Sequence, residues 1–314
     1  MNYEQHRQFT TEQSWRRNGP YKEYLPGDRV DFTVRTLHSD GSLTTEDKWL
    51  IIEGIRGGGF FGQVLIPQDQ NFVIKTSLPD PLHHLWRTIR WELKPFPAQN
   101  IEVAAQLEHL STRLINKVVP ILTNGKFQSP DSLGYTQLPT GYAQVLEKMY
   151  GRGPRDKNEA LKFRQAQKEI IQLALNLGLE QAGQVNPNNP FSLANLWWND
   201  EKGVWIWLDT IPAIPHKAWE EKLLSLDFNK VVRDWFYQKV VTFGRVHTAY
   251  FLNEINQHRH SFSDQDFEEI KANLYLYEKL WEDKEETVKN DKHDLRLAIK
   301  PLTGLIKQLT NHSI

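Results

Sequence analysis

The stretch GGGFFGQV, residues 57–64, has glycines at positions 57, 59 and 62. This G-x-G-x-x-G spacing occurs in two kinds of phosphate-binding loop, one that joins a strand to a helix and one that joins the two strands of a hairpin. The residues that follow, QVLIPQDQNFVIKTS, are rich in β-branched side chains and include Pro67, which disfavours a helix at this point. Two short strands, 63–66 and 71–76, fit the segment better, so the glycines are predicted to lie in a hairpin.

Composition predicts a packed globular protein. The 314 residues include 11 Trp, 15 Phe and 10 Tyr, and 38 Lys and Arg nearly balance 39 Asp and Glu, so no global charge favours nucleic acid or a membrane surface. The absence of cysteine excludes disulfides, thiolate metal sites and a Cys nucleophile. The first residues, MNYEQHRQFTTEQSWRR, lack the apolar stretch of a signal peptide, and no later apolar run approaches the roughly 20 residues of a spanning helix. We therefore expect a cytoplasmic protein without a membrane segment.

Hydrophobic periodicity predicts a sheet-rich N-terminal half. VDFTVRTL and KWLIIEGI flank the turn HSDGS and indicate a hairpin that leads into the glycines. Helical spacing is found over residues 81–93, and a second helix is expected at about 100–115. KVVPIL and YAQVLEKM indicate further strands.

The C-terminal half is predicted to be helical after a linker, GRGPRD, at residues 151–156. The exception is NLWWNDEKGVWIWLD, which indicates two strands around a turn at residues 201–203. A mixed chain of this kind, strands first and helices second, is typical of the α+β class.

Two motifs together carry a resemblance to a known family. GGGFFGQV extends to G-x-G-x-x-G-x-V with Val64 at the valine position, and eleven residues later VIK supplies Lys75. On these motifs the chain resembles the protein-kinase-like superfamily. The resemblance implies an α+β, bilobal fold with a small β-rich N-lobe and a larger helical C-lobe. It divides the chain into an N-terminal extension 1–29, an N-lobe 30–147, a C-lobe 148–285 and a C-terminal helical extension 286–314.

The resemblance also implies an ATP site. Glycines allow backbone N–H groups to approach phosphate oxygens, and the Lys75 ammonium would reach the α and β phosphates. A helix carboxylate is expected to hold this lysine, with Glu102 favoured over Glu108. The segment VLEKMYG resembles the hinge that meets the adenine. The implied nucleotide-binding residues are Gly57, Gly59, Phe61, Gly62, Val64, Lys75, Glu102, Glu147 and Met149.

A Mg²⁺ site is implied at the predicted C-terminal hairpin. Asn195 and Asp209 stand at its two ends with the separation of the asparagine and aspartate that bind the metal in kinases. The sequence departs from the family here, because DTI replaces D-F-G.

The catalytic base is the point at which the resemblance fails. The residue five positions before Asn195 is Pro190, and no aspartate occurs between Asp156 and Asp200. AGQVNPNNPFSLAN resembles the catalytic loops of aminoglycoside phosphotransferases and of the ubiquinone-biosynthesis type of atypical kinase, with Asn186 or Asn188 where aspartate is expected. An amide can orient a hydroxyl group but cannot accept its proton.

The prediction is therefore a pseudokinase that binds ATP and Mg²⁺ and contacts a protein partner through its helical half. The alternatives are an active atypical phosphotransferase, with an acid such as Glu180 as the base, and a nucleic-acid-binding scaffold without nucleotide. HHLWRTIRW, residues 83–91, interleaves basic and aromatic side chains, but its spacing favours an amphipathic helix. HRHS, residues 258–261, is interpreted as a polar helix end rather than a metal site.

Overall fold

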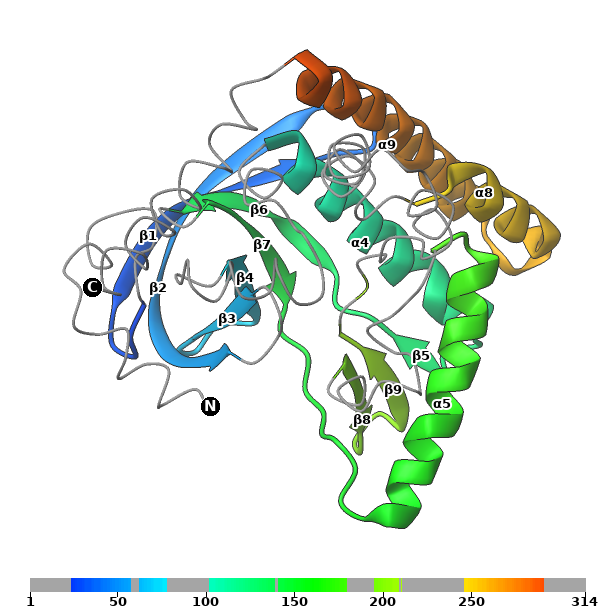
Figure 1. Ribbon diagram of the computed structural model, residues 1–314, viewed down its shortest axis with the longest axis horizontal. Helices are drawn as coiled ribbons and strands as arrows, with labels where there is room; N and C mark the ends of the chain where they lie inside the picture. The colour runs from blue at the N-terminus through cyan, green and yellow to red at the C-terminus, as the bar shows by residue number, and fades with distance from the viewer. Residues whose placement is uncertain are drawn as a thin grey trace, which may run out of the picture.

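A closed antiparallel barrel forms one side of the molecule (Figure 1). The computed structural model describes residues 24–57, 62–77, 102–138, 141–179, 195–208, 210 and 246–290. Six strands form the barrel, in the order β1-β2-β3-β4-β7-β6. Their bounds are β1 Arg29–Leu37, β2 Leu43–Gly57, β3 Gly62–Pro67, β4 Phe72–Ser77, β6 Ser132–Leu138 and β7 Gly141–Glu147.

The predicted first hairpin is confirmed as β1 and β2. Nine residue pairs run in register from Arg29 and Ile51 to Leu37 and Leu43. At the turn, the Asp40 carboxylate accepts hydrogen bonds from the backbone N–H and the hydroxyl of Ser42, at 2.8 and 2.6 Å. Gly41 there has a φ of +82°, which a residue without Cβ adopts at little cost.

The glycine-rich stretch joins two strands, as predicted. β2 ends at Gly57, β3 begins at Gly62, and the two strands pair antiparallel, with Gly57 opposite Gln63. The glycine-rich stretch therefore leads from strand to strand, and not from a strand to a helix. Gly59 and Phe61 lie outside the described residues.

The barrel interior is an apolar core. Side chains alternate along each strand, and the inward set includes Val34, Leu50, Leu65, Ile74 and Val145, which are all buried. Full burial of such a side chain contributes about 1.5–3 kcal/mol. In a barrel of few strands these side chains fill the interior.

In the described residues, a smaller sheet and four α-helices lie beside the barrel. The sheet has the order β5-β9-β8, with β5 parallel and β8 antiparallel to β9. The bounds are β5 Phe127–Gln128, β8 Leu196–Asn199, β9 Val204–Trp207, α4 Glu102–Leu122, α5 Lys157–Asn176, α8 Thr248–Gln257 and α9 Asp264–Asn290. Within the described residues, none of the helices has the length and apolar character needed to cross a bilayer.

The expected bilobal kinase fold is wrong, because the sheet-rich half closes into a barrel and does not stand apart from the helices. A single apolar core continues from α4 and β5 of the first half to α5, α8 and α9 of the second, through residues such as Leu114, Phe127, Phe163 and Trp281. In Figure 1, α4 runs between the barrel and α9.

One expected strand is also helical. KVVPIL, residues 117–122, forms the last turns of α4, with Pro120 inside the helix. Val118 and Val119 are completely buried in the core that α4 shares with α5 and α9. Tertiary packing thus overrides the β-propensity of this segment.

Candidate functional site

Val64 and Lys75 are direct neighbours behind the glycine hairpin. They form a cross-strand pair between β3 and β4, and Lys75 in turn pairs with Gln144 on β7. Paired residues on adjacent strands share one face of a sheet. The residues next to them, Leu65 and Ile74, belong to the barrel core, so Val64 and the half-buried Lys75 lie on the outer face.

This outer row continues in both directions around the barrel. Beyond Gln144 it reaches Tyr135 on β6 and then Arg35 on β1. Beyond Val64 it reaches Arg56 on β2. Its members in order are Arg35, Tyr135, Gln144, Lys75, Val64 and Arg56. We call this set the outer row.

Helix α4 covers the β6 and β7 part of the outer row. The Gln144 Nε2 donates to the Ala105 carbonyl at 3.0 Å, which fixes the helix on the sheet. His109, completely buried on the same helix, contacts the Ser132 hydroxyl through Nδ1 at 2.7 Å and the Leu37 carbonyl through Nε2 at 3.1 Å. Because a carbonyl only accepts, Nε2 carries the proton and Nδ1 accepts from the hydroxyl. Burial lowers the pKa of His109 to about 4.

Glu102, at the start of α4, is the centre of a polar cluster on the same face. Its Oε1 accepts from the Arg35 guanidinium at 2.7 Å and from the Tyr135 hydroxyl at 3.0 Å, and its Oε2 accepts from the Tyr142 hydroxyl at 3.4 Å. The hydrogen bond to Glu102 raises the pKa of Arg35, and burial raises that of Tyr135 to about 12. The Lys75–Glu102 pair stays a prediction, as does the Glu108 alternative.

The other end of the outer row faces the small sheet. The Arg56 guanidinium carbon lies 5.4 Å from the centre of the Trp197 ring on β8, a cation–π contact that joins the barrel to the predicted Trp-rich hairpin. That hairpin is confirmed: β8 and β9 pair antiparallel, and the Leu208 N–H donates to the Asn195 carbonyl at 2.9 Å where they part. Asn195 therefore lies at the open end of the hairpin, and Asp209 lies outside the described residues.

The predicted hinge follows β7. The Glu147 N–H donates to the Asp131 carbonyl and the Lys148 N–H to the Asn71 carbonyl, both at 2.9 Å. These two donors are therefore not available to an adenine ring. Met149, the last residue of the predicted hinge, is partly buried and lies two positions after the end of β7.

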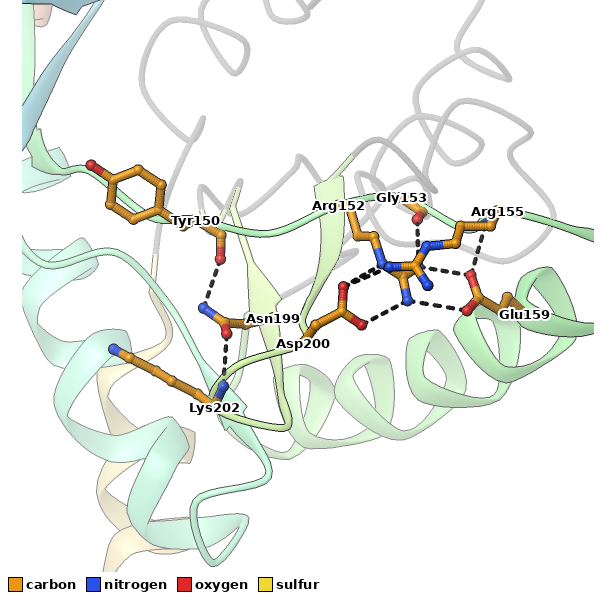
Figure 2. A network of polar contacts seen from close by, with 8 residues as sticks. All are labelled: Tyr150, Arg152, Gly153, Arg155, Glu159, Asn199, Asp200 and Lys202. Carbon is orange, nitrogen blue, oxygen red and sulfur yellow. Dashed lines mark hydrogen bonds and ion pairs between the residues drawn. The ribbon is translucent and has the colours of Figure 1, made fainter.

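Figure 2 shows a charged cluster that the linker reading of GRGPRD missed. The Arg152 guanidinium lies between two carboxylates: it donates to Asp200 at 2.6 and 2.8 Å and to Glu159 at 2.7 and 3.1 Å. Arg155 donates to the same two carboxylates. Hydrogen bonds from Arg152 lower the pKa of Asp200 and Glu159. We call Arg152, Arg155, Glu159 and Asp200 the Arg152 cluster.

Further hydrogen bonds, most of them from the backbone, join the segment 148–156 to β8 and α5. Arg152 and Trp198 exchange N–H···O bonds of 3.0 and 2.8 Å, and the Asn199 amide donates to the Tyr150 carbonyl at 2.8 Å. The Asp156 carboxylate accepts from the Glu159 N–H at 2.8 Å and caps α5. The segment 148–156 is thus fastened to both β8 and α5. The sequence did contain a signal for this cluster, because Arg152, Arg155 and Asp156 are charged residues directly before the start of a helix.

Several predicted positions receive no structural account. Gly59, Phe61, Glu180, Asn186, Asn188 and Asp209 lie outside the described residues, as does the segment 83–91. In the ranges that the structure describes, no group of three or more His, Asp or Glu could hold a metal ion. HRHS lies where α8 ends, at a 3₁₀ turn over Arg259–Ser261, as expected of a polar helix end.

Comparisons with protein-family models, with curated proteins and with solved structures gave no match. The candidate site therefore rests on the residues and contacts of this chain: the glycine hairpin, the outer row from Arg35 to Arg56, and the β8–β9 hairpin that Arg56 touches.

Proposed function

We propose that the protein binds a nucleoside triphosphate with Mg²⁺ on the outer face of β3 and β4, and that it transfers phosphoryl groups slowly or not at all. The observation that carries the proposal is the cross-strand pair of Val64 and Lys75, directly behind a hairpin whose strands end and begin at Gly57 and Gly62. Glycines at a turn allow backbone N–H groups to approach phosphate oxygens, and an adjacent ammonium neutralises their charge.

The charges on this face support an anionic ligand. Lys75 and Arg56 flank Val64, and Gln144 follows Lys75, so this part of the outer row carries two cations and no carboxylate. Lys75 is half-buried, and its attraction to a phosphate is therefore less screened than that of an exposed lysine.

Asn195 and Asp209 are the proposed protein ligands of Mg²⁺. Magnesium in nucleotide sites is bound by one or two side chains together with phosphate oxygens and water, so a three-carboxylate group is not required. Asn195 accepts a backbone hydrogen bond from Leu208, the residue before Asp209. This contact supports the proposal that the two ligands are close together. Bound Mg²⁺ would neutralise phosphate charge.

Slow transfer follows from the segment between Asp156 and Asp200, which contains no aspartate. Asn186 and Asn188 within it can orient a hydroxyl group but cannot take its proton. The loss of a positioned base costs roughly 10²–10⁴ in rate. The ligand would then act by holding the protein in one conformation for a protein partner.

Binding is tested by thermal unfolding in the presence of MgATP. A ligand that binds only the folded state adds about 2.7 kcal/mol of stability at a hundredfold excess over Kd. We expect a concentration-dependent rise in Tm for the native protein and a Kd at least about tenfold weaker for Lys75→Ala, since a charge-assisted phosphate contact contributes about 1.5–3 kcal/mol. Lys48→Ala is the matched control, because Lys48 is also a partly buried strand lysine and lies on β2, away from the Val64–Lys75 pair. Equal binding by the two variants, or no rise in a folded native protein, would contradict the proposal.

Transfer is tested separately by ATP turnover in the native protein and in Asp209→Ala. Background turnover in both, with binding retained by the native protein, is the expected result. Turnover lost only in the variant would identify an enzyme. Rapid native turnover, at the roughly 1–100 s⁻¹ of ordinary kinases, would show that an acid such as Glu180 supplies the base.

A further inference from the structure

The barrel interior contains one polar layer at its glycine end. Gln63 pairs with Thr76 across β3 and β4, and Thr136 pairs with Ala143 across β6 and β7. Thr76 and Ala143 each stand one position along from the Lys75–Gln144 pair, so the four residues form a row directly inside the outer row. All four are buried, with exposures of 2%, 3%, 0% and 2% for Gln63, Thr76, Thr136 and Ala143. We call this row the inner polar layer.

Two of its polar atoms have no hydrogen-bond partner in the described part of the chain: Gln63 Nε2 and Thr136 Oγ1. A buried donor or acceptor without a partner is strongly unfavourable, and native proteins satisfy such atoms with ordered water. The next layer of the barrel, with Leu65, Ile74 and Val145, is apolar. Among the residues of the six barrel strands, the two unsatisfied atoms both lie in the row nearest the glycines.

The side chains of the layer differ in size in a way that favours a shared ligand. Gln63 is long and reaches inward from β3. Ala143 and Thr76, on the strands between Gln63 and Thr136, are short. Val34, one position along from the Arg35–Tyr135 pair, completes the layer beside Thr136. The layer thus has only short side chains on the strands between Gln63 and Thr136.

We propose that the inner polar layer binds an ordered water molecule. Its oxygen accepts from Gln63 Nε2, and it exchanges a second hydrogen bond with the Thr136 hydroxyl, which can donate or accept. These two contacts lie within the two to four that buried waters make. The layer lies immediately inside Lys75 and Gln144, so this water would link β3 to β6 across the interior of the barrel. The proposal depends on the barrel alone and not on nucleotide binding.

A double-mutant cycle tests it. Thr136→Val and Gln63→Met each remove one polar contact while nearly preserving shape. If one water joins the two side chains, each substitution lowers Tm by about 2–6 °C and the double variant loses clearly less than the sum. If the layer is dry, each substitution removes an unsatisfied polar atom, so Tm stays level or rises and the effects add. That result would overturn the proposal.

Two further variants serve as controls. Thr136→Ser keeps the hydroxyl and is expected to retain most of the native Tm, which separates a lost contact from a failure to fold. Val145→Thr introduces a hydroxyl into the apolar layer one step deeper and should lower Tm, whereas Val34→Thr, within the polar layer, should lower it less. A crystal structure of the full chain at high resolution should show solvent density between Gln63 and Thr136. Clear absence of that density would also refute the water.

Discussion

The Arg35 guanidinium donates to the Glu102 carboxylate at 2.7 Å. This contact connects the seam of the barrel, where β1 pairs with β6, to the first turn of α4. The two residues are 67 positions apart in sequence, and the same carboxylate also accepts from Tyr135 and Tyr142. This ion pair is therefore part of a network, which is a stronger stability argument than an isolated surface pair.

Replacing Glu102 by Gln should lower the free energy of unfolding by about 1 kcal/mol. The charge that holds Arg35 is lost, but solvent screens a pair whose side chains are 31% and 37% exposed. Asp31→Asn is the matched control on β1, since its pair with Arg29 is 69% and 61% exposed and should change stability by less than about 0.5 kcal/mol. Urea unfolding of both variants measures the difference. Equal effects would mean that the Glu102 network adds nothing.

His109 should make the protein sensitive to mild acid. Its pKa is about 4 in the folded protein against 6.5 in an unfolded chain, so between these values the unfolded state binds more protons. The contribution of the neutral imidazole is complete above pH 6.5 and declines as the pH falls towards 4, by about 3 kcal/mol in all. Urea unfolding from pH 7.5 to 4.5 should show this loss in the native protein and a shallower slope in His109→Gln. Equal slopes in the two proteins would mean that His109 contributes nothing to the pH dependence.

Arg152→Lys should loosen the connection between the barrel and the small sheet. An ammonium cannot donate in pairs to both Asp200 and Glu159, as the guanidinium does. We expect the Trp198 amide, which donates to the Arg152 carbonyl, to exchange its hydrogen at least about tenfold faster. Arg155→Lys, in which the lost side-chain contact is a single bond to Asp200, is the control. Unchanged protection at Trp198 in Arg152→Lys would show that the backbone pairing needs no support from the side chain.

Gly134→Ala should destabilise the barrel by about 3 kcal/mol or more. Gly134 has a φ of +152°, and a Cβ there would lie 2.6 Å from the Arg35 carbonyl oxygen and 2.7 Å from Val34 Cγ1. The position lies where the pairing of β6 with β7 shifts register. Gly125→Ala is the control: its φ is +78°, but no atom lies within 4 Å, so only the backbone cost of about 1–2 kcal/mol applies. Similar losses of stability in the two variants would mean that the close contact of Gly134 with β1 adds no cost beyond that of the backbone conformation.

Local patterns in the sequence predicted the local structure well. Pro67 and the β-branched residues around it distinguish a hairpin from a helix after Gly62, and the hairpin is present. The alternation of VDFTVRTL and the turn residues Asp40 and Gly41 likewise predicted β1 and β2. These features depend on neighbours within a few positions, which a single sequence displays directly.

Long-range relationships were missed. Closure of the barrel depends on β6 pairing with β7 on one side and β1 on the other, and only the backbone freedom of Gly134 allows the close approach to Val34 and Arg35. Nothing near Arg35 in sequence indicates that Glu102 is its partner. Val118 and Val119 favour a strand locally but are buried against α5 and α9, where a helix fits.

The order in which a ribosome makes this chain has a consequence for the barrel. Arg35 and Tyr135, the pair that closes it, lie 100 positions apart, and β7 follows later still. The β1–β2 hairpin therefore emerges early and waits with one hydrogen-bonding edge uncovered until β6 has been synthesised. The exposed charges on β1, Arg29 and Asp31, would discourage that edge from pairing with another nascent chain during this interval.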